Sequence, residues 1–310
     1  MQGGMQQVTI GLFHDETIAK ELGKKATASD MVFFHRKKDD LVFSFVYPVE
    51  DKITAKSQIM NMLDVAIISA EHITPAVGET ILMLDSLKVT KGIFIIPPYA
   101  DTHQLEKMIK DTSLESFQFI SKDVHKIIYF LEKQAIKRNQ DEAGVITIDH
   151  SFHVKGVGEV VLGFVTQGNI SKHDKLMIQP IGKETLVRSI QMQDDDVDHA
   201  PTGSRVGLAL KNVTVDDLKR GYLLSTSEEV HSDSSLTLSF SKNPFYPTIS
   251  TGSFHATIGL QTVPIKITNI ETEKITIETD KPVCYLKNQA VIILDLNADK
   301  LHHMGTGTIT

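Results

Sequence analysis

FHVKGVGEVVLG, residues 152–163, joins two runs of β-branched and apolar residues through a pair of glycines. Gly156 and Gly158 can take up the positive φ angles that a tight turn needs. The runs on either side, 145–152 and 159–165, have the length and composition of β-strands. The sequence therefore predicts a β-hairpin near the middle of the chain.

Strand-like runs continue from this hairpin to the end of the sequence. They recur about every 8–12 residues, separated by turn residues, and none has a convincing helical period. A polar break at 225–235 divides them into two groups, each of the size of a minimal β-domain. We therefore predict two all-β barrels, at 140–229 and 230–310.

The first part of the chain has a different pattern, because apolar strands alternate there with helical periods. Strands are predicted at 8–13, 31–35, 41–47, 65–69, 92–96 and 116–120, and helices at 15–25, 51–63, 75–87, 102–111 and 123–138. Such alternation is typical of a parallel sheet with crossover helices. Residues 1–139 are therefore predicted to form an α/β domain, and 139–144 a polar linker.

Composition limits the classes of protein that this sequence fits. The chain has 310 residues, a net charge of −7 and 23% charged residues, as expected of a globular protein. No apolar run approaches the ~20 residues of a membrane span, and residues 1–7 carry no export signature. The single cysteine, Cys284, suits a reducing compartment and is expected to be a buried structural thiol. We therefore expect a cytoplasmic protein without a membrane partner.

An ordered series of short motifs fills residues 145–225. It comprises Ile148-Asp149, the stretch 152–163, Asp174-Lys175-Leu176, and the runs 187–191, 203–210 and 219–224. This series resembles the second domain of translation elongation factor Tu, and most of all that of the selenocysteine-specific factor, SelB. Residues 242–246 and 304–309 resemble the third domain of the family more weakly. The resemblance implies a P-loop-NTPase-like α/β domain followed by two β-barrels.

The resemblance also implies a GTPase site in the first domain, but its phosphate-binding motif, G-x-x-x-x-G-K-[ST], is missing. The first strand runs directly into His14-Asp15-Glu16-Thr17, without a glycine-rich loop. Asp15 and Glu16 place negative charge at the start of a helix, where they would repel a phosphate. The only nearby Gly-Lys pair, Gly23-Lys24, lacks the upstream glycine.

The other two GTPase motifs are also absent. Tyr47-Pro48-Val49-Glu50-Asp51 stands where the family has Asp-Thr-Pro-Gly-His. Pro97-Pro98-Tyr99-Ala100-Asp101 stands where N-K-x-D would recognise guanine. We therefore expect a degenerate, non-catalytic GTPase domain that needs no nucleotide cofactor. The arrangement of its domains should not respond to nucleotide, because no ligand would supply the differential binding energy.

Five residues of the second domain are candidates for binding RNA or another partner. Gln191, Asp194 and Arg205 match positions that border the pocket for the aminoacyl end of tRNA in the family, and Lys155 and Arg188 are the other cations considered. Asp194 reverses an expected positive charge, which argues against aminoacyl-tRNA binding of the usual kind. The structural alternative is that Arg205 pairs with the acidic run 194–198 at the surface.

Two further groups of residues invite a functional interpretation. The basic clusters Lys24-Lys25 and Arg36-Lys37-Lys38 are predicted on loops, either as solvated turns or as contacts to RNA phosphates. The thirteen histidines lack cysteine partners and carboxylates at ligand spacing, so no metal site is expected.

Two functional hypotheses follow. The first is a translation-factor-like protein that binds RNA or a ribosomal partner, with tRNA or the ribosome as candidates, and does not hydrolyse GTP. The second is a regulatory or scaffold protein that uses its β-barrels to bind another protein. Salt-dependent retention on tRNA or ribosomes favours the first hypothesis, and salt-insensitive association with one protein favours the second.

Overall fold

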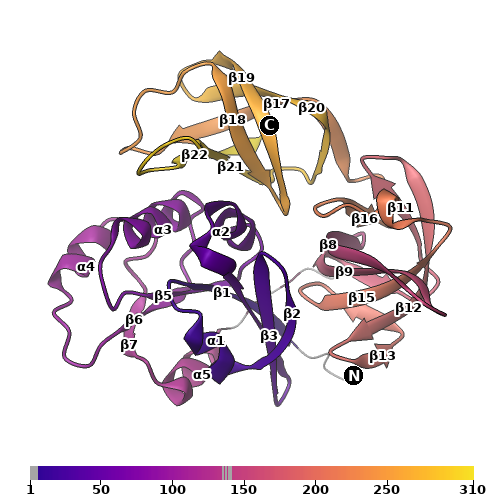
Figure 1. Ribbon diagram of the computed structural model, residues 1–310, viewed down its shortest axis with the longest axis horizontal. Coiled ribbons are helices and arrows are strands. Elements are labelled where there is room, and N and C mark those ends of the chain that lie inside the picture. The colour runs from indigo at the N-terminus through magenta and orange to yellow at the C-terminus, as the bar shows by residue number, and fades with distance from the viewer. Residues whose placement is uncertain (1–5, 135, 137, 139–141) are drawn as a thin grey trace. The chain divides into compact units, whose positions relative to one another are not determined.

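The N-terminal part of the chain folds around one seven-stranded sheet with helices on both faces (Figure 1). The computed structural model describes residues 6–134, 136, 138 and 142–310. The strand order is β2-β3-β4-β1-β5-β6-β7. The strands are β1 (Gln6–Phe13), β2 (Lys24–Ala28), β3 (Met31–Lys38), β4 (Leu41–Pro48), β5 (Val65–Ser69), β6 (Gly92–Ile96) and β7 (Gln118–Ser121).

Parallel pairing dominates this sheet. β1 pairs in parallel with β4 and β5, and β5, β6 and β7 continue in parallel. β2, β3 and β4 form an antiparallel meander at one edge. Strand β5 is buried along its whole length, as expected of a parallel strand covered on both faces. The predicted α/β class is therefore confirmed.

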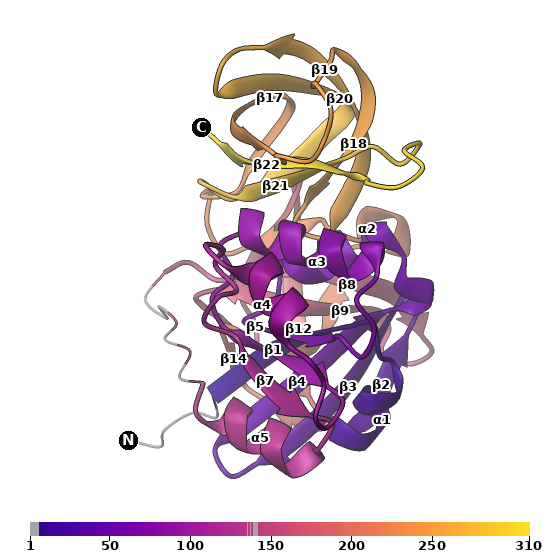
Figure 2. The same ribbon diagram turned by 90° about the vertical axis from the view of Figure 1, so that its left-hand side faces the viewer.

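Five helices cover the sheet. They are α1 (Thr17–Leu22), α2 (Ile53–Met60), α3 (Pro75–Ser86), α4 (His103–Ile109) and α5 (Val124–Glu132). Helices α1 and α5 lie on one face, and α2, α3 and α4 lie on the other (Figure 2). Helix α3 begins where the sequence predicts, because Thr74 accepts a hydrogen bond from the Val77 amide and Pro75 fits the first turn.

All five predicted helices are longer than the observed ones, and α1 and α5 are two clear cases. The helix predicted at 15–25 ends at Leu22, and Lys24–Ala28 forms the edge strand β2 instead. Gly23 is extended there, and a Cβ on it would lie 2.8 Å from the carbonyl oxygen of His35 on β3. This close approach between backbones starts the pairing of β2 with β3, which local helical spacing could not reveal. The helix predicted at 123–138 ends at Glu132.

The two basic clusters, predicted on loops, lie on strands instead. Lys24 and Lys25 lie on β2, and Arg36, Lys37 and Lys38 lie on β3, so both clusters are on neighbouring strands and not on loops. Lysines on an edge strand also protect it from pairing with other chains.

The first barrel follows the α/β domain and closes through six strands. Its strands are β8 (Val145–Val154), β9 (Gly158–Gln167), β11 (Lys175–Gln179), β12 (Lys183–Met192), β15 (Arg205–Lys211) and β16 (Leu223–Ser225), and the β11–β12 pair completes the circle. Short strands β13 (Asp195–Val197), β10 (Asn169–Ser171) and β14 (His199–Pro201) add to it. Gly156 and Gly158 have φ angles of 84° and 104°, which confirms the predicted tight turn between β8 and β9.

The second barrel is also closed, in the order β17-β20-β19-β18-β21-β22. Its strands are β17 (His231–Lys242), β18 (Gly252–Ile258), β19 (Gln261–Ile270), β20 (Lys274–Tyr285), β21 (Ala290–Leu294) and β22 (His303–Ile309). Both predicted barrels are therefore confirmed. Cys284 on β20 is fully buried, and burial raises the pKa of its thiol to about 12, as expected of a structural cysteine.

Contacts divide the chain into two compact units. One contains residues 1–136 together with Ser241–Ile249 and Ile292–Thr306, and the other contains the remainder. Segments of the last predicted domain thus cluster with the α/β domain. The predicted linker at 139–144 lies in part outside the described residues, and the predicted boundaries at 139/140 and 229/230 remain predictions.

Candidate functional site

A cavity of about 690 Å³ opens at the carboxyl ends of β1, β4 and β5. In open α/β sheets this is the edge at which ligands bind. The cavity is lined by side chains from the loops after these strands, from the start of α3 and from the residue after β7. They are Leu12, His14, Asp15, Glu16, Thr17, Tyr47, Pro48, Glu50, Asp51, Ser69, Glu71, His72, Thr74, Ala76, Val77 and Lys122.

An ion pair between Asp15 and Lys122 holds the connection from β1 to α1. Asp15 Oδ1 accepts hydrogen bonds from the amide and the hydroxyl of Thr17, at 2.8 and 2.7 Å. Asp15 Oδ2 lies 2.5 Å from Nζ of Lys122. Burial raises the pKa of the Asp15 carboxyl, but the hydrogen bonds from Lys122 and Thr17 outweigh burial and hold that pKa below its usual value.

A second ion pair lies on the opposite wall, between the 3₁₀ turn Val49–Asp51 and helix α2. Asp51 Oδ2 is 2.6 Å from Nζ of Lys56 and 3.2 Å from Nδ1 of His14. Lys56 is almost completely buried, and a buried charge needs a partner. Asp51 provides the opposite charge. Burial raises the pKa of Asp51, but the hydrogen bonds from His14 and Lys56 lower it further than burial raises it.

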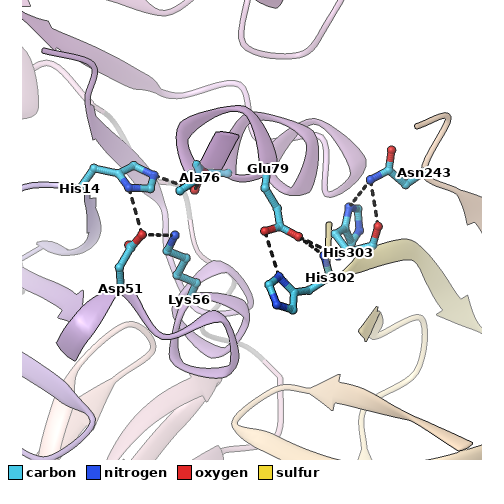
Figure 3. A network of polar contacts seen from close by, with 9 residues as sticks. His14, Asp51, Lys56, Ala76, Glu79, Asn243, His302 and His303 are labelled. Atoms are coloured by element: carbon cyan, nitrogen blue, oxygen red, sulfur yellow. Dashed lines mark hydrogen bonds and ion pairs between the residues drawn. The ribbon is translucent and has the colours of Figure 1, made fainter. Parts of the chain in front are cut away.

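His14 connects this pair to helix α3, as Figure 3 shows. Its Nε2 lies 2.8 Å from the hydroxyl oxygen of Thr80, and that hydroxyl donates to the carbonyl of Ala76. An aspartate, a histidine and a hydroxyl in series resemble the arrangement that activates a nucleophile. Thr80 is fully buried, however, and its proton is directed to the helix backbone. Asp51, His14 and Thr80 therefore connect the loop after β1 to helix α3, and the buried hydroxyl of Thr80 is not accessible to a substrate.

Negative charge dominates the cavity. Five carboxylates line it, those of Asp15, Glu16, Glu50, Asp51 and Glu71, against a single lysine, Lys122. Glu16 also contacts Tyr47: burial raises the pKa of the Tyr47 hydroxyl, and the charge and hydrogen bond of Glu16 raise it further. Two of the five carboxylates, Glu50 and Asp51, belong to the segment 47–51, where the resemblance implies an Asp-Thr-Pro-Gly-His motif.

Helix α3 also holds a segment from the end of the chain, within the same compact unit (Figure 3). Glu79 Oε1 accepts hydrogen bonds from the amides of His302 and His303, at 2.6 and 2.8 Å. About two turns further along the helix, the hydroxyl of Ser86 lies 2.7 Å from that of Thr306. The helix whose first turn lines the cavity therefore also positions residues 302–306.

His303 is the most deeply buried titratable group of this contact. Its side chain is completely enclosed, and Asn243 donates to its backbone carbonyl at 2.9 Å. Burial lowers the pKa of the His303 imidazole to about 4, although the backbone of Gly305 opposes this shift. The imidazole is therefore neutral at physiological pH.

The five residues predicted to bind a partner are distributed over the first barrel. Gln191 is exposed, and its side-chain amide donates to Asp196 at 2.9 Å. Asp194 is exposed in the turn before β13, with a φ angle of 72°. Lys155 is exposed in the β8–β9 turn. Arg188 reaches the same turn from β12 and donates to the carbonyl of Val157 at 2.8 Å.

Arg205 has a different environment from the other four. Its Nη2 lies 3.2 Å from Oδ2 of Asp149, a partner that was not predicted from the sequence. The side chains of Arg205 and Asp149 are 16% and 4% exposed. Arg220 approaches the other oxygen of Asp149, at 3.6 Å. β8, β15 and the loop before β16 bring these three residues together, a proximity that their positions in the sequence do not indicate.

Some residues of these sites received no role from the sequence. They are Lys122, Lys56, Glu79 and Arg220, and all but Lys56 meet their partners from a distant element. Among the described residues, no three His, Cys, Asp or Glu side chains are grouped so that they could hold a metal ion. None of the helices described combines the length and the apolar character needed to cross a membrane.

Comparison with known proteins places these features in context. Residues 158–225 match the sequence family described as elongation factor Tu domain 2. Over 98% of the chain and the full length of the relative, the sequence is 34% identical to "Uncharacterized protein MJ0325" of Methanocaldococcus jannaschii. A selenocysteine-specific elongation factor of the same organism is 37% identical over 49% of this chain, which spans only 33% of that factor.

Solved structures extend the similarity of fold to nearly the whole chain. The translation elongation factor SelB from Methanococcus maripaludis, in complex with the GTP analogue GPPNHP, superimposes with a TM-score of 0.84. The match covers 99% of this chain and 80% of that one, at 22% sequence identity. The apo form of the same factor gives a TM-score of 0.82.

Proposed function

This chain belongs to the family of the archaeal protein MJ0325 and is homologous to selenocysteine-specific elongation factors, and on this premise we propose a translation-factor-like protein that binds RNA or a ribosomal partner without hydrolysing GTP. It would act in the cytoplasm, with tRNA or the ribosome as the partner. The observation that carries the non-catalytic part is the ion pair of Asp15 with Lys122 at the connection from β1 to α1.

A bound nucleotide would compete with groups of the chain itself. A phosphate at this connection needs backbone amides and a lysine. The amide of Thr17 and the amine of Lys122 are already bound to the Asp15 carboxylate. Four further carboxylates line the cavity, so a triphosphate would bring its charges into an excess of like charge. These contacts support a domain that does not bind GTP.

Calorimetric titration with GTP and GDP in the presence of magnesium tests this part of the proposal. Loss of three charge-assisted hydrogen bonds would weaken a micromolar site to millimolar or worse, so no heat is expected. A translational GTPase that binds nucleotide, measured in the same buffer, is the positive control. A Kd below about 100 μM for either nucleotide would contradict the proposal.

Retention of the full chain on ribosomes and on tRNA, with and without ribonuclease, tests the partner. We expect retention that is lost after ribonuclease and that falls as salt rises. Salt-insensitive association with one protein, unchanged by ribonuclease, would favour the scaffold hypothesis instead.

Variants of the first barrel locate the predicted contact. Gln191→Ala and Arg188→Glu are the informative changes, because both side chains are exposed. Arg205 is less suitable, since a glutamate at that position would meet the buried Asp149 and disturb the barrel itself. Lys24→Glu on β2 is the matched control and should weaken retention less. Equal retention of all three variants and the parent would remove the first barrel as the contact.

A further inference from the structure

A small cavity of about 370 Å³ lies at the outer edge of the α/β domain, between strand β7 and helix α5. β7 pairs with β6 on one side and is the last strand of the sheet order. Phe119 and Phe130 give the cavity an apolar floor. Its rim carries Lys126 and Tyr129 from α5 and Lys133, which directly follows the helix. No carboxylate is among the described residues that line it, although the chain as a whole has a net charge of −7.

The three rim residues form one surface of the helix. Lys126 and Tyr129 are spaced at i and i+3 on α5, and Lys133, the C-cap residue of the helix, continues the same face at i+7. Tyr129 is a large aromatic residue with 60% of its side chain exposed, and Nζ of Lys133 lies 3.8 Å from the centre of its ring. Lys126 sits one turn earlier, with its amine 3.4 Å from the hydroxyl of Ser121 on β7.

We propose that this surface, Lys126, Tyr129 and Lys133 over the β7–α5 cavity, binds a nucleotide of single-stranded RNA. The base would stack on Tyr129, and the flanking phosphates would contact the two lysines. Aromatic rings between cations are the means by which proteins hold single strands without reading their sequence. Stacking a base contributes more than a cation–π contact at an exposed site, so the base can replace the Lys133 amine on the ring while that amine turns to a phosphate.

An acidic peptide is the competing occupant, since it would also match the two lysines. A peptide bound along an exposed strand edge gains its affinity from main-chain hydrogen bonds. β7 has only four residues, and only part of their backbone groups face away from β6. The cavity beside the ring offers room for a planar group, which a base supplies. The geometry therefore favours RNA.

This inference rests on the proposed function, since it names where RNA would contact the first domain. It is tested with the full-length chain and fluorescein-labelled oligouridylate and oligoadenylate of about ten nucleotides, by fluorescence anisotropy. Tyr129→Ala should weaken binding of both oligonucleotides by about 5- to 150-fold. Tyr99→Ala is the matched control, because Tyr99 is a fully exposed tyrosine of the same domain without a lysine in its loop, and it should leave affinity unchanged.

The salt dependence of binding tests the role of the two lysines. Changing Lys126 and Lys133 together to Gln should reduce the slope of log affinity against log salt by about 1.4, because two phosphate contacts are lost. Equal affinities of Tyr129→Ala and Tyr99→Ala, or no binding of either oligonucleotide, would overturn the inference. Displacement of the oligonucleotide by an equal concentration of oligoglutamate would overturn it in favour of a peptide. If retention on ribosomes or tRNA persisted in any of these cases, only this surface and not the proposed function would be excluded.

Discussion

The cavity of the α/β domain and the outer surface of the first barrel both contain buried ion pairs, but their charge excess is opposite. In the cavity, Lys122 and Lys56 each have an aspartate partner, and further carboxylates remain around an open space. On the barrel, the single carboxylate of Asp149 is shared by Arg205 and Arg220 and is almost completely enclosed. We therefore expect substitutions in the acidic site to cost less stability than substitutions at Asp149, which is the more deeply buried group.

Asp149→Asn should have the largest effect, because it removes the almost fully buried carboxylate that Arg205 and Arg220 both approach. Removal of one partner from a buried ion pair typically costs about 3–5 kcal/mol. Urea unfolding measures this loss. Asp194→Asn, in an exposed turn of the same barrel, is the control and should change the free energy of unfolding by less than about 0.5 kcal/mol. Similar values for both variants would mean that the barrel does not depend on Asp149.

His303 should make the protein sensitive to mild acid. Its pKa is about 4 in the folded state, against 6.5 as the ordinary value, so the unfolded chain takes up the proton first. The stabilisation is complete above pH 6.5 and is lost as pH falls toward 4, by about 3 kcal/mol at most. The measurement is the free energy of unfolding across this range.

The matched variants for this prediction are His303→Gln and His199→Gln. The first should flatten the loss of stability between pH 6.5 and 4, and the second, at an exposed position on β14, should not. Asp15 and Asp51 affect the free energy of unfolding in a lower pH range. Their pKa values are lowered, so their stabilisation is present above pH 3.8 and is lost only below it. An unchanged slope in His303→Gln would contradict the assignment.

Glu79→Ala should loosen the segment held by α3, because the amides of His302 and His303 lose their common acceptor. Buried donors left without a partner cost about 2 kcal/mol together. Hydrogen exchange at these two amides should accelerate. The amides of β5, on the other side of α3, provide the internal control. Unchanged exchange at 302 and 303 would mean that Glu79 is not their principal support.

Asp15→Ala should have the smallest effect of the series, about 1 kcal/mol, because Lys122 is one-third exposed and can turn to water. Thermal unfolding measures the change, with Glu71→Ala as a control in the same cavity. A loss as large as that of Asp149→Asn would show that the cavity's ion pairs are as structural as those of the barrel.

Local patterns predicted most of the fold. β6 was predicted at its observed bounds and α3 to within one residue, because a buried run and a capped amphipathic pattern are both complete within a few residues. The two strands of the central hairpin were likewise predicted close to their observed bounds. The candidate site was predicted less well: the missing phosphate loop was visible in the sequence, but the partners of Asp15 and Asp51 were not.

The sequence alone predicted most of the helices and strands and the burial of Cys284, since each depends on neighbouring residues. Only the tertiary structure decided that Lys24–Ala28 is a strand, that Arg205 meets Asp149, and that Glu79 holds the backbone at 302–303. Pairing between distant segments depends on where the chain places them, and a charged side chain carries no local mark of the partner that will neutralise it. Burial makes such pairs energetically decisive, and burial is a property of the folded chain.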